Sequence, residues 1–273
     1  MRIGGTIWPA GPLGLLLLAL LAAALGPMLP LPDPYAQDFS ALGAPPSATH
    51  LLGTDEIGGD VLARLLLGCR LSLTFGLFAA LVALAAGGVL GLVAMAIGGA
   101  LEVAVFALVD LVRAMPGILF ALAMVAALEP GTLSVVLALG VSFAPTFARI
   151  VASTWRREQA AGYVAAARCF GAGRLRTAFA HILPNLRGPL VTQFAIVLPR
   201  CIVSESVLSF IGLGVSPETP TWGRMISAGA LNLEEAPHAL LAPVVALALL
   251  TWALSMLADS LRRVADPLRR RAA

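Results

Sequence analysis

The chain of 273 residues is 59% hydrophobic and only 12% charged, with a formal net charge of +3. Its mean hydropathy of +0.92 exceeds what a water-soluble domain carries, because such a domain must cover its core with polar side chains. The composition therefore excludes a soluble globular protein and predicts an all-α polytopic membrane protein.

Six apolar stretches approach or exceed the roughly 20 helical residues needed to cross a hydrocarbon core of about 30 Å. We expect these spans at about residues 7–29, 71–97, 103–128, 133–153, 190–213 and 239–261. The first span follows Arg2 and resembles a secretory signal, but we favour an uncleaved span, because its apolar run continues to Leu31 and five more spans follow. An even number of spans places both termini on one side.

The arginines predict which side that is, because the chain contains no lysine and positive loops mark the cytoplasm. They gather between spans four and five and after span six, at Arg149, Arg156, Arg157, Arg168, Arg174, Arg176, Arg187, Arg262, Arg263, Arg269, Arg270 and Arg271. Acidic residues gather in the opposite loops, at Asp33, Asp38, Asp55, Glu56, Asp60, Glu218, Glu234 and Glu235. We expect a multi-pass protein of the cell inner (plasma) membrane, surrounded by lipid, with both termini cytoplasmic and no nucleic-acid partner.

The loop between spans four and five contains AAARCFGAGRLRTAFAHILPN, residues 165–185. One face of a first short helix carries Ala161, Val164, Ala165 and Arg168, and the small side chains on this face would let a partner approach the backbone closely. Gly171 and Gly173 permit the positive φ that ends this helix. The pattern predicts a glycine elbow.

A second short helix is predicted after the elbow, with Leu175, Phe179 and Ile182 forming an apolar stripe. Pro184 lacks an amide hydrogen and disfavours helical angles at Leu183, so this helix should end before span five. A loop of this kind, with nothing catalytic in it, favours docking on another protein. The alternative is a helix that lies on the membrane surface.

Residues with catalytic or metal-binding chemistry form no recognisable constellation. Cys69, Cys169 and Cys201 are odd in number and far apart, which favours a role as small apolar fillers. The three histidines, His50, His181 and His238, have no carboxylate or cysteine at ligand spacing, and the phosphate-binding loop GxxxxGK[ST] requires a lysine. We expect no enzymatic activity, no metal and no cofactor on this chain.

The loop resembles the EAA loop of the membrane subunits of binding-protein-dependent ABC importers, whose pattern is Glu-Ala-Ala, three residues, Gly, nine residues, then Ile-x-Leu-Pro. The spacing is kept by Ala166, Ala167, Gly171, Leu183 and Pro184. Two positions depart from the pattern. Ala165 stands in place of the glutamate and His181 in place of the isoleucine, so one polar contact to the ATPase is in doubt while the elbow is unaffected.

Three further segments resemble the dipeptide, oligopeptide and nickel branch of this family: HLLGTDEIGGDVLARLLLGCRLSL, SESVLSFIGLGVSPETPTWGRMI and LADSLRRVADPLRRR. The resemblance implies a type I ABC importer permease fold with a cytoplasmic EAA coupling loop. Residues 1–70 would form an N-terminal transmembrane helix and external segment. Residues 71–273 would form a five-helix permease core with the coupling loop at 156–187.

The resemblance also implies partners: a second related permease subunit, two ATPase subunits that bind the ATP, and an external solute-binding protein. The residues implied to contact the ATPase are Ala165, Ala166, Ala167, Gly171, Leu175, Phe179, His181, Leu183 and Pro184. ATP-driven motion of a helix wedged in the ATPase would pass through the loop to spans four and five.

The implied solute is a di- or oligopeptide, with nickel or another small solute as the alternative. An ion-coupled secondary transporter is a different class with a similar number of spans. It requires an ion site at mid-membrane, for which Glu205 is the lone candidate.

Intramembrane charges are costly and are therefore candidates for function. Glu205 lies in span five and matches a glutamate of the family, with a role in the pathway or subunit interface, or as a bonded interior carboxylate. Arg200 in the same span is five residues away and is a poor direct partner on a helix. Asp110 and Arg113 are spaced for a structural salt bridge.

Two residues on the external side have competing interpretations. Asp60 contacts the external docking protein or, as we favour, caps the helix that begins at Val61. Trp222 is expected to be an interfacial anchor, with a part in an outer gate as the alternative.

Overall fold

The computed structural model describes residues 2–3, 6–7, 10–129, 131–173, 176–216 and 218–265. Its helices in chain order are α1 (Ala10–Leu25), the 3-10 helix η1 (Gly26–Met28), α2 (Val61–Ile97), α3 (Gly99–Ala114), α4 (Gly117–Ala127), α5 (Thr132–Gln159), α6 (Gly162–Cys169), the π-helix η2 (Thr177–Ile182), α8 (Leu183–Phe210), α9 (Trp222–Leu231) and α10 (Pro237–Ala265). Two short antiparallel strands, β1 (Arg2–Ile3) and β2 (Thr6–Ile7), precede them.

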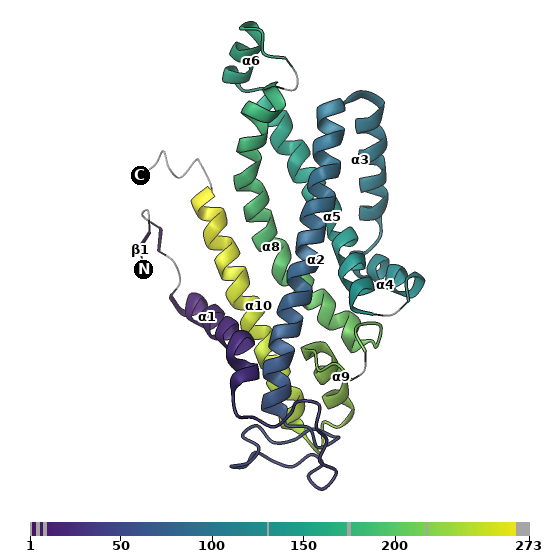
Figure 1. Ribbon diagram of the computed structural model, residues 1–273. Coiled ribbons are helices and arrows are strands. Elements are labelled where there is room, and N and C mark those ends of the chain that lie inside the picture. Colours follow the sequence, from purple (N-terminus) through teal and green to yellow (C-terminus); the bar gives the residue numbers. More distant parts are fainter. Residues whose placement is uncertain are drawn as a thin grey trace.

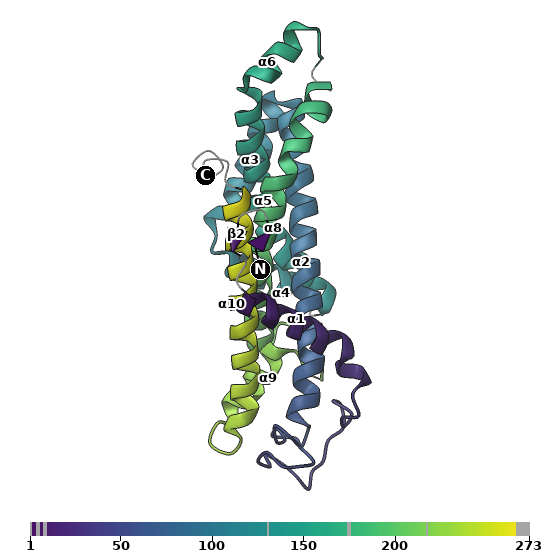
Figure 2. The ribbon, with the colours of Figure 1, turned by 90° about the vertical axis from the view of Figure 1, so that its left-hand side faces the viewer.

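The long helices form an elongated bundle in which α2, α5 and α8 pack on one another (Figure 1). Helix α10 packs against α8, and α1 crosses α2 and α10 on the outside of the bundle (Figure 2). Helix α6 lies at one end, while α9 and the loop between α1 and α2 lie at the other (Figure 1). The chain therefore has two ends with loops and a helical middle.

Four described helical segments are long and apolar enough to cross a membrane: Val61–Ile97, Thr132–Gln159, Thr177–Phe210 and Pro237–Arg263. They match predicted spans two, four, five and six. Helix α1 matches span one but has only 16 residues, about 24 Å at 1.5 Å per residue. The 37 residues of α2 rise about 55 Å, well beyond a hydrocarbon core of about 30 Å.

The prediction of a continuous third span over residues 103–128 is wrong. Helices α3 and α4 are bent by 97° at the break between them. Pro116 causes this break, because it disfavours helical angles at Met115, which has the extended angles φ −88° and ψ 143°. The bent pair accounts for a fifth span only when both helices are taken together.

The predicted salt bridge between Asp110 and Arg113 is also wrong, because Asp110 pairs with Arg149 of α5 instead. The Arg149 guanidinium also lies 5.2 Å from the centre of the Phe106 ring. Near the same end, Arg156 pairs with Glu102 at 2.8 Å. These contacts fasten α3 to α5, which spacing along a single helix could not reveal.

Small residues let α2 approach its neighbours closely. The side of α2 that faces the bundle carries Gly76, Ala79, Ala80, Ala83, Gly87 and Gly91, all buried. A Cβ at Gly87 would overlap the carbonyl oxygen of Ala144 on α5, and a Cβ at Gly76 would overlap Ile202 of α8. Close backbone approach through small residues is how helices associate in lipid, where the hydrophobic effect is weak.

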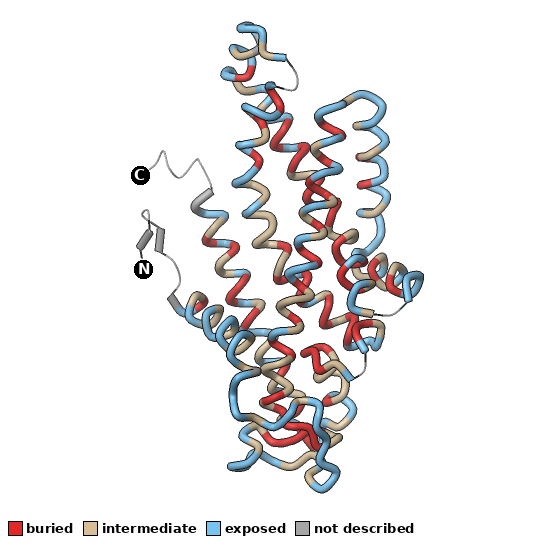
Figure 3. Tube along the Cα trace, in the orientation of Figure 1, coloured by how far each residue is buried: buried red, intermediate tan, exposed pale blue. Residues whose placement is uncertain are grey.

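Buried residues follow the inner faces of α2, α5 and α8, whereas α1 and α3 are largely exposed (Figure 3). The exposed positions on α1 and α3 are mainly leucine and valine, including Leu17, Leu18, Val103 and Leu111. Apolar side chains on the outside of a bundle suit lipid as the surrounding solvent.

The glycine contact between α2 and α5 yields a matched pair of variants. Gly87→Ala should destabilise the protein by about 1–3 kcal/mol, because the added methyl group would force the two helices apart. Gly88→Ala should be neutral or slightly stabilising, because a Cβ at Gly88 meets nothing within 4 Å. Thermal unfolding of both purified variants in detergent tests this, and equal midpoints would contradict it.

Candidate functional site

Helix α6 is positioned by a glycine at its end, as the sequence predicts. Gly171 has a φ of +84°, and the Ala172 amide donates to the Ala167 carbonyl at 3.0 Å. This bond is the one that spans the end of a helix in a Schellman motif. A Cβ added at Gly171 would meet nothing within 4 Å, so the backbone angle alone requires glycine at this position.

The prediction that a second short helix ends before Pro184 is wrong. Residues 177–182 form a π-helix that continues directly into α8, and Pro184 lies in the first turn of α8. The wider π turn places the Leu183 amide on the Ala178 carbonyl, and proline needs no amide partner at a helix start. Span five is therefore joined to the loop without a break.

Several exposed residues of the loop are apolar. Ala165 and Ala166 of α6 are exposed, as are Phe170, 90% exposed, and Phe179, 67% exposed. Phe170 was not singled out by sequence reasoning, although it is the aromatic residue directly before the glycine elbow. Exposed aromatic side chains in one loop are typical of an interaction site.

The predicted stripe of Leu175, Phe179 and Ile182 does not form a single face. Ile182 is fully buried while Phe179 points to the outside, because the π-helix changes the spacing between neighbouring turns. Leu175 lies outside the described residues, as does the side chain of Arg168. Of the other predicted contact residues, Pro184 is exposed, whereas Ala167, His181 and Leu183 are partly buried.

A polar clasp, formed by Glu158, Tyr163 and Asn185, ties the loop together. The Tyr163 hydroxyl donates to Glu158 Oε2 at 2.5 Å, and Asn185 Nδ2 donates to the same oxygen at 3.0 Å. Asn185 Nδ2 also lies 2.8 Å from the Tyr163 hydroxyl and 3.0 Å from the His181 carbonyl oxygen. The clasp joins the end of α5, the start of α6 and the start of α8.

The clasp also shifts the ionisation of its tyrosine. Partial burial raises the pKa of Tyr163, and its hydrogen bond to the Glu158 carboxylate and that negative charge add to the effect. The side chain of Glu158 is only 13% exposed and also pairs with Arg157 at 3.3 Å. Glu158 and Asn185 are 27 positions apart in the sequence. No short motif connects them, so sequence reasoning missed the clasp.

The opposite end is organised around Asp60. Its Oδ1 accepts from the Ala63 amide at 2.7 Å, which confirms the predicted cap of α2. Its Oδ2 lies 2.9 Å from His50 Nδ1, a contact between residues ten positions apart that the sequence did not predict. The loop before α2 is also held to the start of α10, because His238 Nε2 donates to the Thr54 carbonyl at 2.9 Å.

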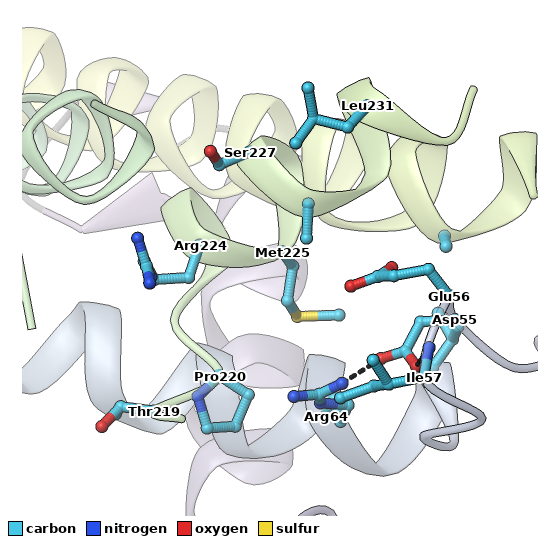
Figure 4. Close-up of a pocket in the computed structure, with 13 residues that line it drawn as sticks. Asp55, Glu56, Ile57, Arg64, Thr219, Pro220, Arg224, Met225, Ser227 and Leu231 are labelled. Carbon is cyan, nitrogen blue, oxygen red and sulfur yellow. Dashed lines mark hydrogen bonds and ion pairs between the residues drawn. The ribbon is translucent and has the colours of Figure 1, made fainter. Parts of the chain in front are cut away.

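A pocket of about 280 Å³ lies at this end, between the loop before α2 and helix α9 (Figure 4). Asp55 pairs with Arg64 along one wall, and the Glu56 carboxylate points into the space beside Met225 (Figure 4). Burial raises the pKa of Glu56, and the neighbouring Asp55 charge adds to the rise. Arg224 of α9 lines the far side.

Trp222 is not the exposed interfacial anchor that the sequence favoured. It is 3% exposed, and its indole Nε1 donates to the Leu65 carbonyl at 2.9 Å. Gly68 makes room for it, because a Cβ there would lie 2.8 Å from the indole ring. The tryptophan therefore locks α9 to α2.

Glu205 is fully buried between helices of this chain. Its Oε1 accepts from Ser209 Oγ at 2.8 Å, while Oε2 has no partner among the described residues. No ion pair between Glu205 and Arg200 is recorded in the described part of the chain, as their spacing predicts. Full burial favours the interior-carboxylate interpretation.

The cysteines differ in environment. Cys69 and Cys201 are buried, as small apolar fillers should be, but Cys169 at the end of α6 is exposed. Within the described ranges, His, Cys, Asp and Glu side chains form no group of three that could hold a metal ion.

Comparisons with known proteins cover most of the chain. Residues 70–271 match the family model described as "Binding-protein-dependent transport system inner membrane component". The chain is 36% identical to the di/tripeptide transport system permease protein DppC of Pseudomonas aeruginosa, over 90% of this chain and 83% of the relative. It is 35% identical to the glutathione transport system permease protein GsiD of Pectobacterium atrosepticum, over 89% of this chain and 81% of the relative.

A solved structure shares the fold. A chain of the MetNI methionine ABC transporter, in an inward-facing conformation, superposes with a TM-score of 0.61 and 19% sequence identity. The match covers 74% of this chain and 96% of the other.

The polar clasp predicts the behaviour of the loop. Tyr163→Phe should speed amide hydrogen exchange across residues 162–169 by about three- to tenfold, because a hydrogen bond contributes about 0.5–1.5 kcal/mol. Tyr35→Phe is the control, because Tyr35 is the other tyrosine of the chain, is exposed, and its hydroxyl has no partner among the described residues. Unchanged exchange in Tyr163→Phe would show that the clasp does not hold α6.

Proposed function

The chain belongs to the family of binding-protein-dependent transport system inner membrane components and is a permease subunit of an ABC importer, and we propose that its residues 156–187 are the coupling loop. One observation carries the proposal. Exposed apolar residues, Ala165, Ala166, Phe170 and Phe179, lie in the loop at one end of the bundle, between the long helices α5 and α8. An ATPase subunit binds these exposed residues.

The loop is built to transmit motion. Helix α5 leads into it, and the π-helix η2 continues directly into α8, so a displacement of the loop would act on both long helices. The polar clasp adds a second link between α5, α6 and α8. Closure of the ATPase pair on ATP would thus change the packing of α5 and α8, which are in contact with α2 in the core.

We propose that the solute is a short peptide, with nickel or another small solute as the alternative. The support is that relatives with at least 35% identity carry the names of a di/tripeptide and a glutathione transport permease. Uptake of labelled dipeptide into vesicles, by the complete importer with its binding protein, tests the solute. Transport of Ni²⁺ without peptide would favour the alternative.

The remaining assignments follow from the family. We propose a second related permease subunit, two ATPase subunits that bind the ATP, and a solute-binding protein at the end that holds Asp60 and Trp222. Because both side chains are buried, they would shape that surface rather than touch the partner. Residues 1–70 are then the N-terminal transmembrane helix and external segment, and residues 71–273 the five-helix permease core.

The glycine elbow gives the sharpest test of the coupling loop. Gly171→Val should reduce transport and solute-stimulated ATPase activity, because a β-branched residue at a φ of +84° is strained by about 1–2 kcal/mol and would tilt the loop. Phe179→Asp should do the same by placing a charge on the apolar surface. Both proteins should still insert in the membrane.

Two variants serve as controls for the elbow. Gly173→Val should be tolerated better than Gly171→Val, because Gly173 does not require a positive φ and a Cβ there meets nothing within 4 Å. Ala165→Glu restores the family's carboxylate at an exposed position and should be tolerated. Co-purification with the ATPase subunits and transport in vesicles are the measurements. Normal binding and transport in both damaging variants would overturn the coupling loop.

The orientation of the bundle is testable separately. Arg156, Arg157, Arg262 and Arg263 lie in the last turns of α5 and α10, which point toward the end that carries α6 (Figure 1). We propose that this end is cytoplasmic because positive charge is retained on that side. A fluorescent reporter fused after Ala273 should fluoresce, and alkaline phosphatase fused there should be inactive. The reverse result would invert the topology.

A further inference from the structure

A second pocket, of about 460 Å³, lies between α8 and α10 and is lined on its third side by Phe143 of α5. This volume is within the range of about 300–1,000 Å³ typical of small-molecule sites. Its lining includes Arg200 and Ser204 of α8 together with Ser255 and Asp259 of α10. The lining therefore combines apolar side chains with polar and charged ones.

Arg200 lies in the segment Thr177–Phe210, which is long and apolar enough to cross a membrane, about 15 Å of helix rise before its end at 1.5 Å per residue. This position is inside the span rather than in a loop. The Arg200 side chain is exposed on the surface of this chain. A guanidinium inside a span cannot face lipid without a large cost, so protein, water or a solute must cover it.

Both charges of the pocket are free of partners. Arg200 and Asp259 line the same pocket, yet neither side chain has a hydrogen bond or ion pair to any described residue. Ser255 Oγ donates to the Thr251 carbonyl at 2.7 Å, which leaves its lone pairs free to accept. Arg200 and Asp259 thus bring a positive and a negative side chain to the lining of one cavity.

We infer that this pocket is a transient site for the two charged ends of a zwitterionic peptide on its way through the membrane. Arg200 binds the terminal carboxylate, for which a guanidinium has matching geometry, and Asp259 binds the terminal ammonium group. Ser204 and Ser255 add hydroxyl groups along the wall. The inference rests on the proposed function, because it assigns that importer's solute to named residues.

Charge-neutral variants of the complete importer test the assignment. In vesicles supplied with binding protein and ATP, Arg200→Gln and Asp259→Asn should each lower uptake of labelled dialanine at least tenfold. Arg200→Lys should recover part of the loss because it keeps the charge. Arg262→Gln, at an exposed arginine of α10 outside the pocket, should transport like the parent.

Thiol labelling reports on the pocket without relying on transport. In a Cys169→Ser background, where the remaining Cys69 and Cys201 are buried, Ser255→Cys should react with a water-soluble methanethiosulfonate reagent. Dialanine trapped during turnover should slow this labelling severalfold. Arg200→Gln should abolish the protection.

The outcomes separate the inference from the function on which it rests. If the parent importer takes up no dialanine, the proposed solute class fails, and this ligand fails with it. If the parent transports dialanine and Arg200→Gln does so equally well, or if Ser255→Cys is never protected, only the pocket assignment is overturned. Loss of co-purification with the second permease in Arg200→Gln would show instead that the arginine is a subunit contact.

Discussion

The close contact between α2 and α5 is the interaction on which the rest of this bundle depends. Lipid offers little hydrophobic gain for burying one apolar helix against another, so the helices must be held by close van der Waals packing. Gly87 and Gly91 allow that packing because their backbones touch α5 directly, and Gly76 does the same toward α8. Without this contact, α5 and α8 would lack a fixed surface against which to move.

The close packing of α2 against its neighbours explains how a small loop can act on a large bundle. The proposed coupling loop extends beyond the packed helices, between the end of α5 and the start of α8. A force on α6 would therefore act on α5 and α8, the two helices that pack against the glycines of α2. The polar clasp supports this transfer, because it joins α6 to both helices. The missing glutamate at Ala165 affects the outer surface of α6, and the Glu158 carboxylate inside the clasp is unaffected.

The sequence predicted features that depend on local chemistry. Long apolar runs located α2, α5, α8 and α10, Asp60 marked the start of α2, and Gly171 marked the end of α6. These succeed because hydropathy, caps and positive φ act within a few residues. The bend at Pro116 was missed because the apolar run continues through it, so composition alone favoured one span.

Features set by distant contacts were not predictable. Asp110 has a local partner at the right spacing, but Arg149 on another helix is better placed. Trp222 looked like an anchor because aromatic residues near a membrane surface usually are, whereas the space beside Gly68 buries it. The clasp joins residues from three elements, and the π turn that lets Asn185 reach Glu158 leaves no signature in hydropathy.

The two sides of α8 show how stability and transport are kept apart in one chain. On the side facing α2, Ile202 of α8 packs against Gly76, and the buried Glu205 accepts a hydrogen bond from Ser209, so that side is closed. Toward α10, the packing opens into a pocket whose opposite charges, Arg200 and Asp259, have no described partners. Unpaired charges within a membrane span cost stability. A chain held together by the contacts of α2 with α5 and α8 can tolerate such charges on the side of α8 that faces α10. The costly groups therefore lie where they can meet a solute, away from the contacts that hold the bundle.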